Sequence, residues 1–203
     1  TQGVGNIKDS ARLMQTTAEQ KKVLVDYPVT GTGLPTLGTQ VLMNVINETG
    51  ALPTRNMREV QFEGANNISG EQMLEPRERD GKPNLTTNAA CFACTIACGR
   101  ISTIDQGHFT VENKPQYWGN SGGLEYEAAW ALGADTGVDD LDALTYANFV
   151  CNEDGFDPIS FGATLAAAIE LYDIGAITKE DTGGMELKFG SAEALAWSAE
   201  KVA

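Results

Sequence analysis

Three of the four cysteines in this 203-residue chain fall within eight residues, as Cys91, Cys94 and Cys98. If the stretch is helical, spacings of three and four residues bring the thiols onto one face, where they converge on one point. Thiolates that converge in this way suit an iron–sulfur cluster, which needs four ligands. The remaining cysteine, Cys151, lies far downstream in a different context. The fourth ligand is therefore the open question.

Other roles for the cysteine run stay open on the residues alone. Zinc sites usually present two Cys-x-x-Cys pairs or added histidines, and the single histidine, His108, falls in a polar loop. A redox dithiol, or cysteines that only pack, are further interpretations. Radical enzymes that use S-adenosylmethionine have Cys-x3-Cys-x2-Cys, with the longer gap first, whereas here it comes second. We therefore favour a [4Fe–4S] cluster.

Two carboxylates, Glu125 and Glu127, stand near the start of a helix predicted over residues 124–132. Residues two apart lie on different faces, so one carboxylate can be solvated while the other points inward. Burial would raise the pKa of the inward carboxylate and suit it to acid–base chemistry. The alternative is that both carboxylates only complement the helix dipole.

The turn after Cys151 combines polar side chains with the apolar Phe156. Gly155 ends one predicted helix and Asp157 caps the next, so ordinary capping explains much of the pattern. The turn also exposes polar groups beside Phe156, as a ligand clamp would need. Cys151 itself is most simply a packed residue.

The glycine-rich stretch 31–38 invites a dinucleotide-binding interpretation. Its third glycine comes two places late and no apolar strand precedes it. We favour a turn that leads into a helix.

Composition predicts a globular protein. Hydrophobic residues make up 42% of the chain, and the formal charge of -14 opposes nonspecific binding to nucleic acid or anionic membranes. No apolar stretch reaches the length of a membrane span, and the first residues show no signal-peptide pattern. We expect a cytoplasmic protein whose clustered thiols stay reduced and available to metal.

The elements that must position these groups are mainly helical. Periodicity, caps and breakers predict helices over residues 7–26, 39–49, 124–132, 138–154, 158–172 and 191–202. Between them we expect a glycine-rich loop over 28–39, an irregular stretch over 51–90, a short hairpin over 100–111 and a strand over 185–189. The fold class is mainly α, with long irregular loops and few short strands.

Several motifs occur in an order that resembles tungsten-dependent aldehyde:ferredoxin oxidoreductases. They are the cysteine run, Pro28-Val-Thr-Gly-Thr-Gly-Leu-Pro-Thr-Leu-Gly-Thr39, Asn44-Val-Ile-Asn-Glu-Thr-Gly-Ala-Leu-Pro-Thr-Arg-Asn56, Gly123-Leu-Glu-Tyr-Glu127, Leu132-Gly-Ala-Asp-Thr-Gly-Val-Asp-Asp140 and Cys151-Asn-Glu-Asp-Gly-Phe-Asp-Pro-Ile-Ser160. The resemblance covers nearly the whole chain. It implies that residues 1–203 form a single α-helical domain of a longer oxidoreductase. The N-terminal pterin-binding β domain and the C-terminal helical domain would be absent.

The resemblance also implies roles for individual residues. Cys91, Cys94 and Cys98 would hold three corners of the [4Fe–4S] cluster, with the fourth ligand in a later domain. The family's Asp-x-x-Gly-Leu-Asp/Cys pterin motif falls on Asn152, Gly155, Phe156 and Asp157, with asparagine for aspartate and phenylalanine for leucine. An amide still hydrogen-bonds a pterin edge, without charge assistance. Glu127 matches a proton-transfer glutamate near tungsten, with Glu125 as the fallback.

By resemblance, the parent enzyme oxidises a small-molecule aldehyde to a carboxylic acid on a tungsten bis-pterin, with ferredoxin as electron acceptor. The alternatives are a tungsten subunit of a related reductase acting on another substrate, a free-standing iron–sulfur electron-transfer module completed by Cys151, and a structural zinc domain. Some members carry a Glu-x-x-His iron site, but the matching stretch 146–149 lacks both residues. We expect the isolated fragment to be inactive and to lose both cofactors.

Overall fold

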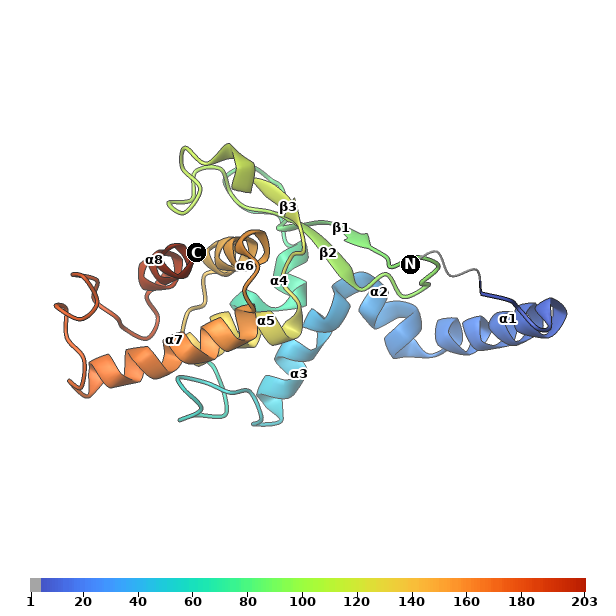
Figure 1. The fold of residues 1–203 in the computed structure, drawn as a ribbon, viewed down its shortest axis with the longest axis horizontal. Helices are drawn as coiled ribbons and strands as arrows, with labels where there is room; N and C mark the ends of the chain where they lie inside the picture. Colours follow the sequence, from blue (N-terminus) through green and yellow to red (C-terminus); the bar gives the residue numbers. More distant parts are fainter. Residues whose placement is uncertain (1–4) are drawn as a thin grey trace.

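The computed structural model describes residues 5–203 as a set of helices with one small sheet (Figure 1). Four helices form the C-terminal half: α5 (Tyr126–Leu132), α6 (Leu141–Asp154), α7 (Pro158–Asp173) and α8 (Ala192–Val202). Helix α5 packs on α7, and α6 packs on α8. Helix α6 is buried without a break from Ala143 to Cys151. A helix buried all round needs small and apolar residues on every side, which this stretch supplies.

The C-terminal helices end within one residue of the predicted positions, and three of them, α6, α7 and α8, begin at a side-chain cap, although α6 begins at Leu141 rather than at residue 138. The Asp140 carboxylate accepts a hydrogen bond from the Ala143 N–H at 3.0 Å, and the Asp157 carboxylate accepts one from Ser160 at 2.8 Å. Ser191 caps α8 in the same way. Gly155 ends α6 in the left-handed region, with φ of 78°.

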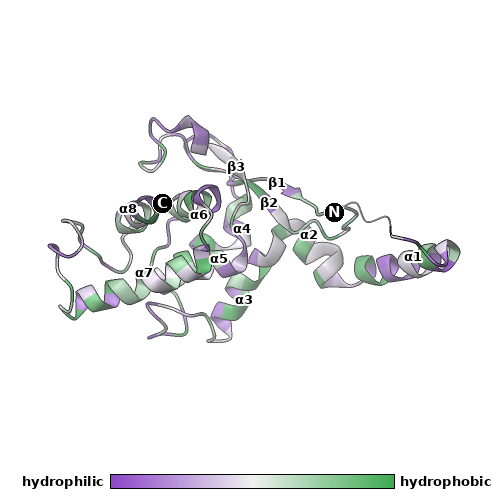
Figure 2. Ribbon diagram, viewed as in Figure 1, coloured by the Kyte–Doolittle hydropathy of each residue, from purple (hydrophilic) through white to green (hydrophobic). Residues whose placement is uncertain are grey.

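The N-terminal half starts with α1 (Ser10–Asp26), a helix that the sequence predicts and that projects from the body of the molecule (Figure 1). None of its residues is buried. Figure 2 shows hydrophobic and hydrophilic residues mixed along it. Helix α1 therefore owes little to the core that holds the other helices.

The glycine-rich stretch predicted as a loop is helical instead. It forms a π-helix, η1 (Val29–Gly33), then α2 (Leu34–Leu37) and η2 (Gly38–Val41). The next helix, α3 (Leu42–Glu48), lies within the helix predicted over 39–49. Gly31 lies so close to the end of α1 that a Cβ there would sit 2.0 Å from the Val25 carbonyl oxygen. The glycine permits a tight helical turn against the preceding helix. The following residues form η3 (Ala65–Ile68) and α4 (Gly70–Leu74) within the otherwise irregular segment that the sequence predicts.

Three short antiparallel strands make the sheet, in the order β1 (Leu85–Ala89), β2 (Gly99–Thr103), β3 (Gly119–Ser121). The hairpin predicted over 100–111 is wrong. Strand β2 pairs with β1, which precedes it in the sequence, and with β3, which begins only at Gly119. The strand predicted over 185–189 is also wrong, since this segment has no strand partner in the described chain. Instead it buries Leu187 in the core. The remaining elements are the short helices η4 (Pro115–Tyr117) and η5 (Ala134–Thr136).

One continuous hydrophobic core connects the two halves. It draws on segments from Met43 to Ala199, and its largest fully buried apolar side chains are Tyr146, Phe62, Phe149, Met43, Leu52, Ile68, Met73, Ile104, Leu124, Leu132 and Leu144. The sheet lies against this core through Leu85. The two strands that flank the β1–β2 loop are therefore anchored to the core.

Candidate functional site

The three clustered cysteines lie in the loop between β1 and β2, residues 90–98, which we call the cysteine loop. The loop is not helical. Ala93 and Ala97 adopt left-handed conformations with φ of 59° and 53°, and the Cys94 N–H donates to the Cys91 carbonyl at 3.0 Å in a tight turn. The helical arrangement considered for the three thiols is therefore wrong, although the spacing still brings them together.

All three cysteines line one cavity of about 300 Å³, together with Ala89, Ala90, Gly99 and Glu125. We call it the cysteine cavity. Cys91 and Cys94 are exposed and Cys98 is partly buried. Within residues 5–203, no group of three or more His, Cys, Asp or Glu side chains is already arranged around a metal position. The loop therefore gathers the thiols at one place without fixing a coordination geometry.

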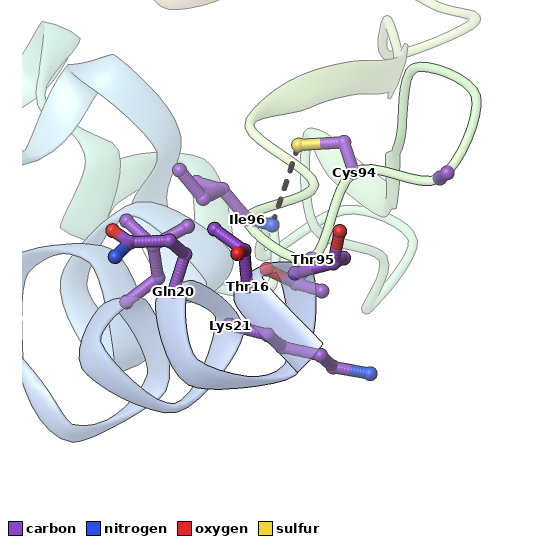
Figure 3. Close-up of a pocket in the computed structure, with 9 residues that line it drawn as sticks. Thr16, Gln20, Lys21, Cys94, Thr95 and Ile96 are labelled. Carbon is purple, nitrogen blue, oxygen red and sulfur yellow. Dashed lines mark hydrogen bonds between the residues drawn. The ribbon is translucent and has the colours of Figure 1, made fainter. Parts of the chain in front are cut away.

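The backbone of the cysteine loop favours a thiolate at Cys94. The N–H groups of Ala97 and Ile96 both lower the pKa of this thiol, and the Ile96 nitrogen lies 3.4 Å from Cys94 Sγ. Figure 3 shows this contact beside a cavity of about 470 Å³ between α1 and the loop. Backbone N–H groups directed at sulfur are one of the factors that tune iron–sulfur sites. The donor set therefore fits such a cluster.

Cys151 does not belong to this group. It lies in α6 with no exposed surface, and burial raises the pKa of its thiol to about 12. It is absent from the lining of the cysteine cavity. The prediction that Cys151 is a packed residue is confirmed, and the described structure gives the electron-transfer module no fourth ligand at this position.

A second cavity of about 350 Å³, the Glu127 cavity, lies next to the cysteine cavity and shares Glu125 with it. Its lining includes Glu127, Arg100 and Asn152, with Ala89, Gly99, Gly122, Gly123, Ala128, Asn148, Pro158 and Ile159. Glu127 is exposed, and its carboxylate accepts a hydrogen bond from the Trp130 indole N–H at 2.6 Å. The structure thus brings Glu127 and Asn152 to one cavity that adjoins the three cysteines.

Glu125 is the inward-facing member of the carboxylate pair. Burial raises the pKa of its carboxyl group, and this outweighs the Thr39 hydroxyl, which donates to Glu125 Oε2 at 2.5 Å, and the charge of Arg100. Thr39 also accepts the Tyr126 N–H at 2.8 Å, which fixes the first turn of α5. The prediction that one carboxylate faces inward and the other faces solvent is confirmed, with Glu125 as the partly buried one and Glu127 exposed.

Arg100 is a site residue that the sequence analysis missed. Its side chain is 1% exposed, and its Nη1 donates to the Asn88 side-chain oxygen across the β1–β2 ladder. Its carbonyl oxygen accepts the N–H groups of Gly122 and Gly123. Burial lowers the pKa of the guanidinium, against the charges of Glu125 and Cys98. The sequence feature that could have indicated a role for Arg100 is its position two residues after Cys98, the last of the clustered cysteines.

The residues matched to the pterin motif separate into two places. The Asn152 amide donates to the Gly122 carbonyl at 2.9 Å, and Asn152 lines the Glu127 cavity. Phe156 packs against Phe161, with ring centroids 5.6 Å apart, and lines a different cavity of about 250 Å³ together with Asp157. The Asp157 carboxylate caps α7. Asn152 is thus the one motif side chain that the described structure places beside Glu127.

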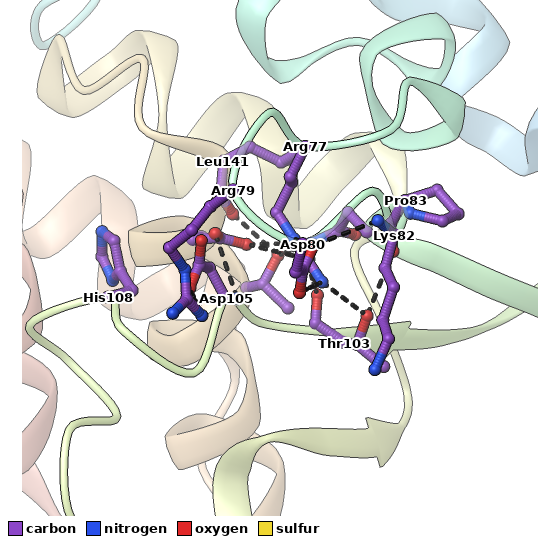
Figure 4. A network of polar contacts seen from close by, with 12 residues as sticks. Arg77, Arg79, Asp80, Lys82, Pro83, Thr103, Asp105, His108 and Leu141 are labelled. Atoms are coloured by element: carbon purple, nitrogen blue, oxygen red, sulfur yellow. Dashed lines mark hydrogen bonds and ion pairs between the residues drawn. The ribbon is translucent and has the colours of Figure 1, made fainter.

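A polar network connects the end of β2 with the start of α6 (Figure 4). Arg77 donates to the Thr103 carbonyl at 2.9 Å and lies 3.7 Å from Asp142, while Arg79 pairs with Asp105. His108, expected in a polar loop, is mostly buried and contacts Asp140. The network ties the charged loop after α4 to the start of α6.

Comparison with known proteins supplies the family. Residues 15–203 match the family described as aldehyde ferredoxin oxidoreductase, domains 2 and 3. The chain is 40% identical over 200 residues to a tungsten-containing aldehyde ferredoxin oxidoreductase of Pyrococcus abyssi and 41% identical over 198 residues to one of Thermococcus kodakarensis. Each alignment covers 97% of this chain and 30% of the relative.

A weaker similarity, 32% over 109 residues, connects the chain with an aliphatic sulfonate oxidoreductase, WOR-like subunit, of Pyrococcus furiosus; it covers 53% of this chain and 16% of the relative. Among the described residues, no helix combines the length and apolar character that a membrane crossing requires. The family match, together with identity of about 40% over nearly the full chain, shows that this chain belongs to the aldehyde ferredoxin oxidoreductase family.

Proposed function

We propose that this chain is the first α-helical domain of a tungsten-pterin, iron–sulfur oxidoreductase that oxidises aldehydes to carboxylic acids. The observation that carries the proposal is the sharing of Glu125 between the cysteine cavity and the Glu127 cavity. An electron-accepting centre at the three thiols would thereby lie beside the cavity that holds Glu127. The curated relatives named above as tungsten-containing aldehyde ferredoxin oxidoreductases support this assignment.

In the proposed reaction, an aldehyde and water give a carboxylic acid, two protons and two electrons. The tungsten bis-pterin, when bound, supplies the two-electron redox chemistry. Glu127 takes up a proton from the attacking water or its equivalent, because its carboxylate reaches the cavity and is oriented by Trp130. Asn152, which lines the same cavity, would contact the pterin. The resemblance assigns the same role to Phe156 and Asp157, although these two line a separate cavity.

A [4Fe–4S] cluster, when bound at the three thiols, would supply the one-electron chemistry that reduction of ferredoxin needs. Cys91, Cys94 and Cys98 would hold three corners, and a residue elsewhere in the complete protein would hold the fourth, because Cys151 is buried in α6. The chain spans about 30% of the length of its curated relatives. Apolar surface for contact with further domains is available on α1, which buries none of its residues, and at Phe92, whose side chain is fully exposed in the cysteine loop.

Metal analysis of the complete protein tests the proposal. Anaerobic purification should give iron and tungsten together with aldehyde oxidation that reduces ferredoxin. Cys94→Ala should lose cluster iron, whereas the matched variant Cys151→Ala should keep it. Iron that depends on Cys151 would favour the electron-transfer module, and zinc in place of iron would favour the structural zinc domain. Robust aldehyde oxidation by the isolated 203-residue chain would contradict its assignment as one domain of the enzyme.

A tungsten subunit that acts on another substrate is the second candidate. The similarity to the aliphatic sulfonate oxidoreductase subunit over 109 residues favours keeping it. Both candidates predict the same metals, so metal analysis does not separate them. An assay of the purified complete protein with aldehydes and with aliphatic sulfonates does.

A further inference from the structure

Arg100 is the largest side chain that is fully buried in the described structure. Arginine is rarely buried unless it is paired, because its charge is costly to remove from water. Its Nη1 contacts Asn88, but its Nε and Nη2 have no hydrogen-bond partner, and no ion pair with Arg100 occurs within residues 5–203. The guanidinium therefore keeps a buried positive charge that no ion pair within residues 5–203 neutralises, while its Nε–Nη2 edge faces Gly38.

The position of this guanidinium is fixed by the fold. Gly38 makes room for it: a Cβ at that residue would lie 1.6 Å from Arg100 Nη2. Asn88, its cross-strand neighbour, holds Nη1 with one side-chain atom and the Pro35 carbonyl with the other. At the stem, a Cβ on Gly123 would lie 2.8 Å from the Arg100 Cβ. Such close support is typical of a side chain whose placement matters beyond its packing.

Arg100 lies in β2, two residues after Cys98, and lines one cavity together with Glu125. Cys98 and Glu125 both line the cysteine cavity, and Arg100 and Glu125 both line the Glu127 cavity. Arg100 therefore lines the cavity that adjoins the cysteine cavity, rather than the cysteine cavity itself. A [4Fe–4S] cluster held by four thiolates has a net negative charge, which becomes more negative when the cluster takes up one electron. A fixed cation nearby favours that reduction.

We propose that Arg100 is the counter-charge of the cluster held by the cysteine loop and that it raises the reduction potential of that cluster. The proposal rests on the proposed function, since it needs a cluster at the three thiols. Arg100 would then make one-electron transfer from the Glu127 cavity to the cluster more favourable. The other possible partner is an anionic group in the Glu127 cavity, such as a cofactor phosphate, and the experiment separates the two.

The test uses the complete protein, purified anaerobically, in four versions: wild type, Arg100→Met, Arg100→Lys and Arg58→Met. Arg58 is the matched control, because it is a partly exposed arginine that pairs with Asp173 and stacks over Phe189, away from both cavities. Iron and tungsten are counted, and the midpoint potential of the cluster is measured by redox titration with electron paramagnetic resonance. These readouts do not depend on turnover.

We expect Arg100→Met to keep tungsten and to shift the cluster potential to a more negative value, while Arg100→Lys shifts it less and Arg58→Met leaves it unchanged. Loss of iron from Arg100→Met but not from Arg100→Lys would also support the proposal, because the charge would then be needed to hold the cluster. An unshifted potential in an iron-replete Arg100→Met would overturn it. So would loss of tungsten with an unshifted potential, which would assign Arg100 to the Glu127 cavity.

Loss of iron from both Arg100 variants would indicate a structural role and would also overturn the proposal. A wild-type protein that binds no iron at the cysteine loop would instead remove the proposed function itself. The two failures are therefore distinguishable, because the first requires a wild type that carries its cluster.

Discussion

His108 Nε2 lies 3.1 Å from the Asp140 carboxylate, and the other ring nitrogen lies 2.8 Å from the Thr110 hydroxyl. Asp140 is also the N-cap of α6, so the imidazole is attached to the start of the central helix. Burial alone would lower the pKa of His108, but Asp140, with the charges of Asp142 and Asp105, raises it above the ordinary value of 6.5. The pair couples protonation to the stability of the fold.

Stability should therefore depend on pH on both sides of neutrality. The raised His108 pKa gives stabilisation that is complete below about pH 6.5 and is lost as pH rises through the folded-state pKa. The pKa of Asp140 is lowered, since the His108 and backbone hydrogen bonds outweigh burial, so its stabilisation is present above about pH 4 and is lost in acid. We expect the free energy of unfolding to fall by about 1 kcal/mol from pH 6 to 8.5 through this pair.

The matched variant for this prediction is His108→Gln, which keeps hydrogen-bonding capacity without a titrating ring. Urea unfolding of the wild type and the variant at several pH values gives the comparison. The variant should be less stable than the wild type near pH 6 and close to it near pH 8.5. Equal pH profiles for the two proteins would show that the pair contributes no pH dependence.

Thr39 connects η2 to the start of α5 through Glu125 and Tyr126. Thr39→Val keeps the shape but removes both hydrogen bonds, leaving a half-buried carboxyl group and a backbone N–H with one partner fewer. We expect a loss of about 1–3 kcal/mol in the free energy of unfolding. Thr39→Ser keeps the hydroxyl and should lose less than half as much. Similar losses in the two variants would assign the effect to the methyl group instead.

Gly38 is the residue whose substitution should be most damaging near the site. It has φ of 60°, and an added Cβ would collide with the Arg100 guanidinium. We expect Gly38→Ala to cost about 3–5 kcal/mol. Gly81→Ala is the control, because Gly81 has φ of 68° but open space around it, so only the backbone penalty of about 1–2 kcal/mol applies. Equal losses in the free energy of unfolding for Gly38→Ala and Gly81→Ala would show that the Arg100 side chain moves aside without destabilising the protein.

Thiol reactivity should distinguish the cysteines in metal-free protein. Cys94 should react fastest with Ellman's reagent, because its thiol is exposed and its pKa is lowered by backbone N–H groups. Cys91 and Cys98 should follow under native conditions. Cys151 should react only after unfolding, since it is buried and its pKa is raised to about 12. Rapid native labelling of Cys151, located by peptide mass analysis, would contradict its placement in the core.

Glu127→Gln should lower kcat for aldehyde oxidation by the complete enzyme by roughly 10²–10⁴-fold, because general base catalysis contributes that range. Iron and tungsten contents should stay the same. Glu125→Gln is the comparison and should affect kcat less, because Glu125 is engaged with Thr39. A larger loss of kcat in Glu125→Gln would transfer the proton-handling role to the buried carboxylate.

The sequence predicted the helices that carry their own boundary signals and missed those that depend on distant contacts. Helices α6, α7 and α8 have capping or helix-ending residues close to their boundaries in the sequence, such as Gly155 at the end of α6 and Asp157 at the start of α7. The glycine-rich stretch was predicted as a loop, because the reason for Gly31, the nearby Val25 carbonyl, is visible only in the folded chain. Strand β2 was paired wrongly for the same reason, since its partners lie on both sides of it along the chain.

At the site, residue types and spacing predicted the cysteine group, and the carboxylate pair was predicted to divide between inside and outside. Which carboxylate turns inward depends on Thr39, which is 86 residues away from Glu125. Arg100 was missed because a single arginine in a strand has no local pattern that indicates burial. Its environment is created by Gly38, Asn88 and Gly123, which come from three separate segments.

The cysteine loop begins and ends on paired strands, with Ala89 opposite Gly99 and Asn88 opposite Arg100. None of these contacts uses a sulfur atom. In small zinc domains, by contrast, metal binding supplies the folding free energy and the unfolded chain must capture its ion. Here the strands on both sides of the cysteine loop are held by backbone pairing and a hydrophobic core, so insertion of the proposed cluster is separable from folding. An assembly machinery would therefore meet a finished scaffold rather than a nascent chain.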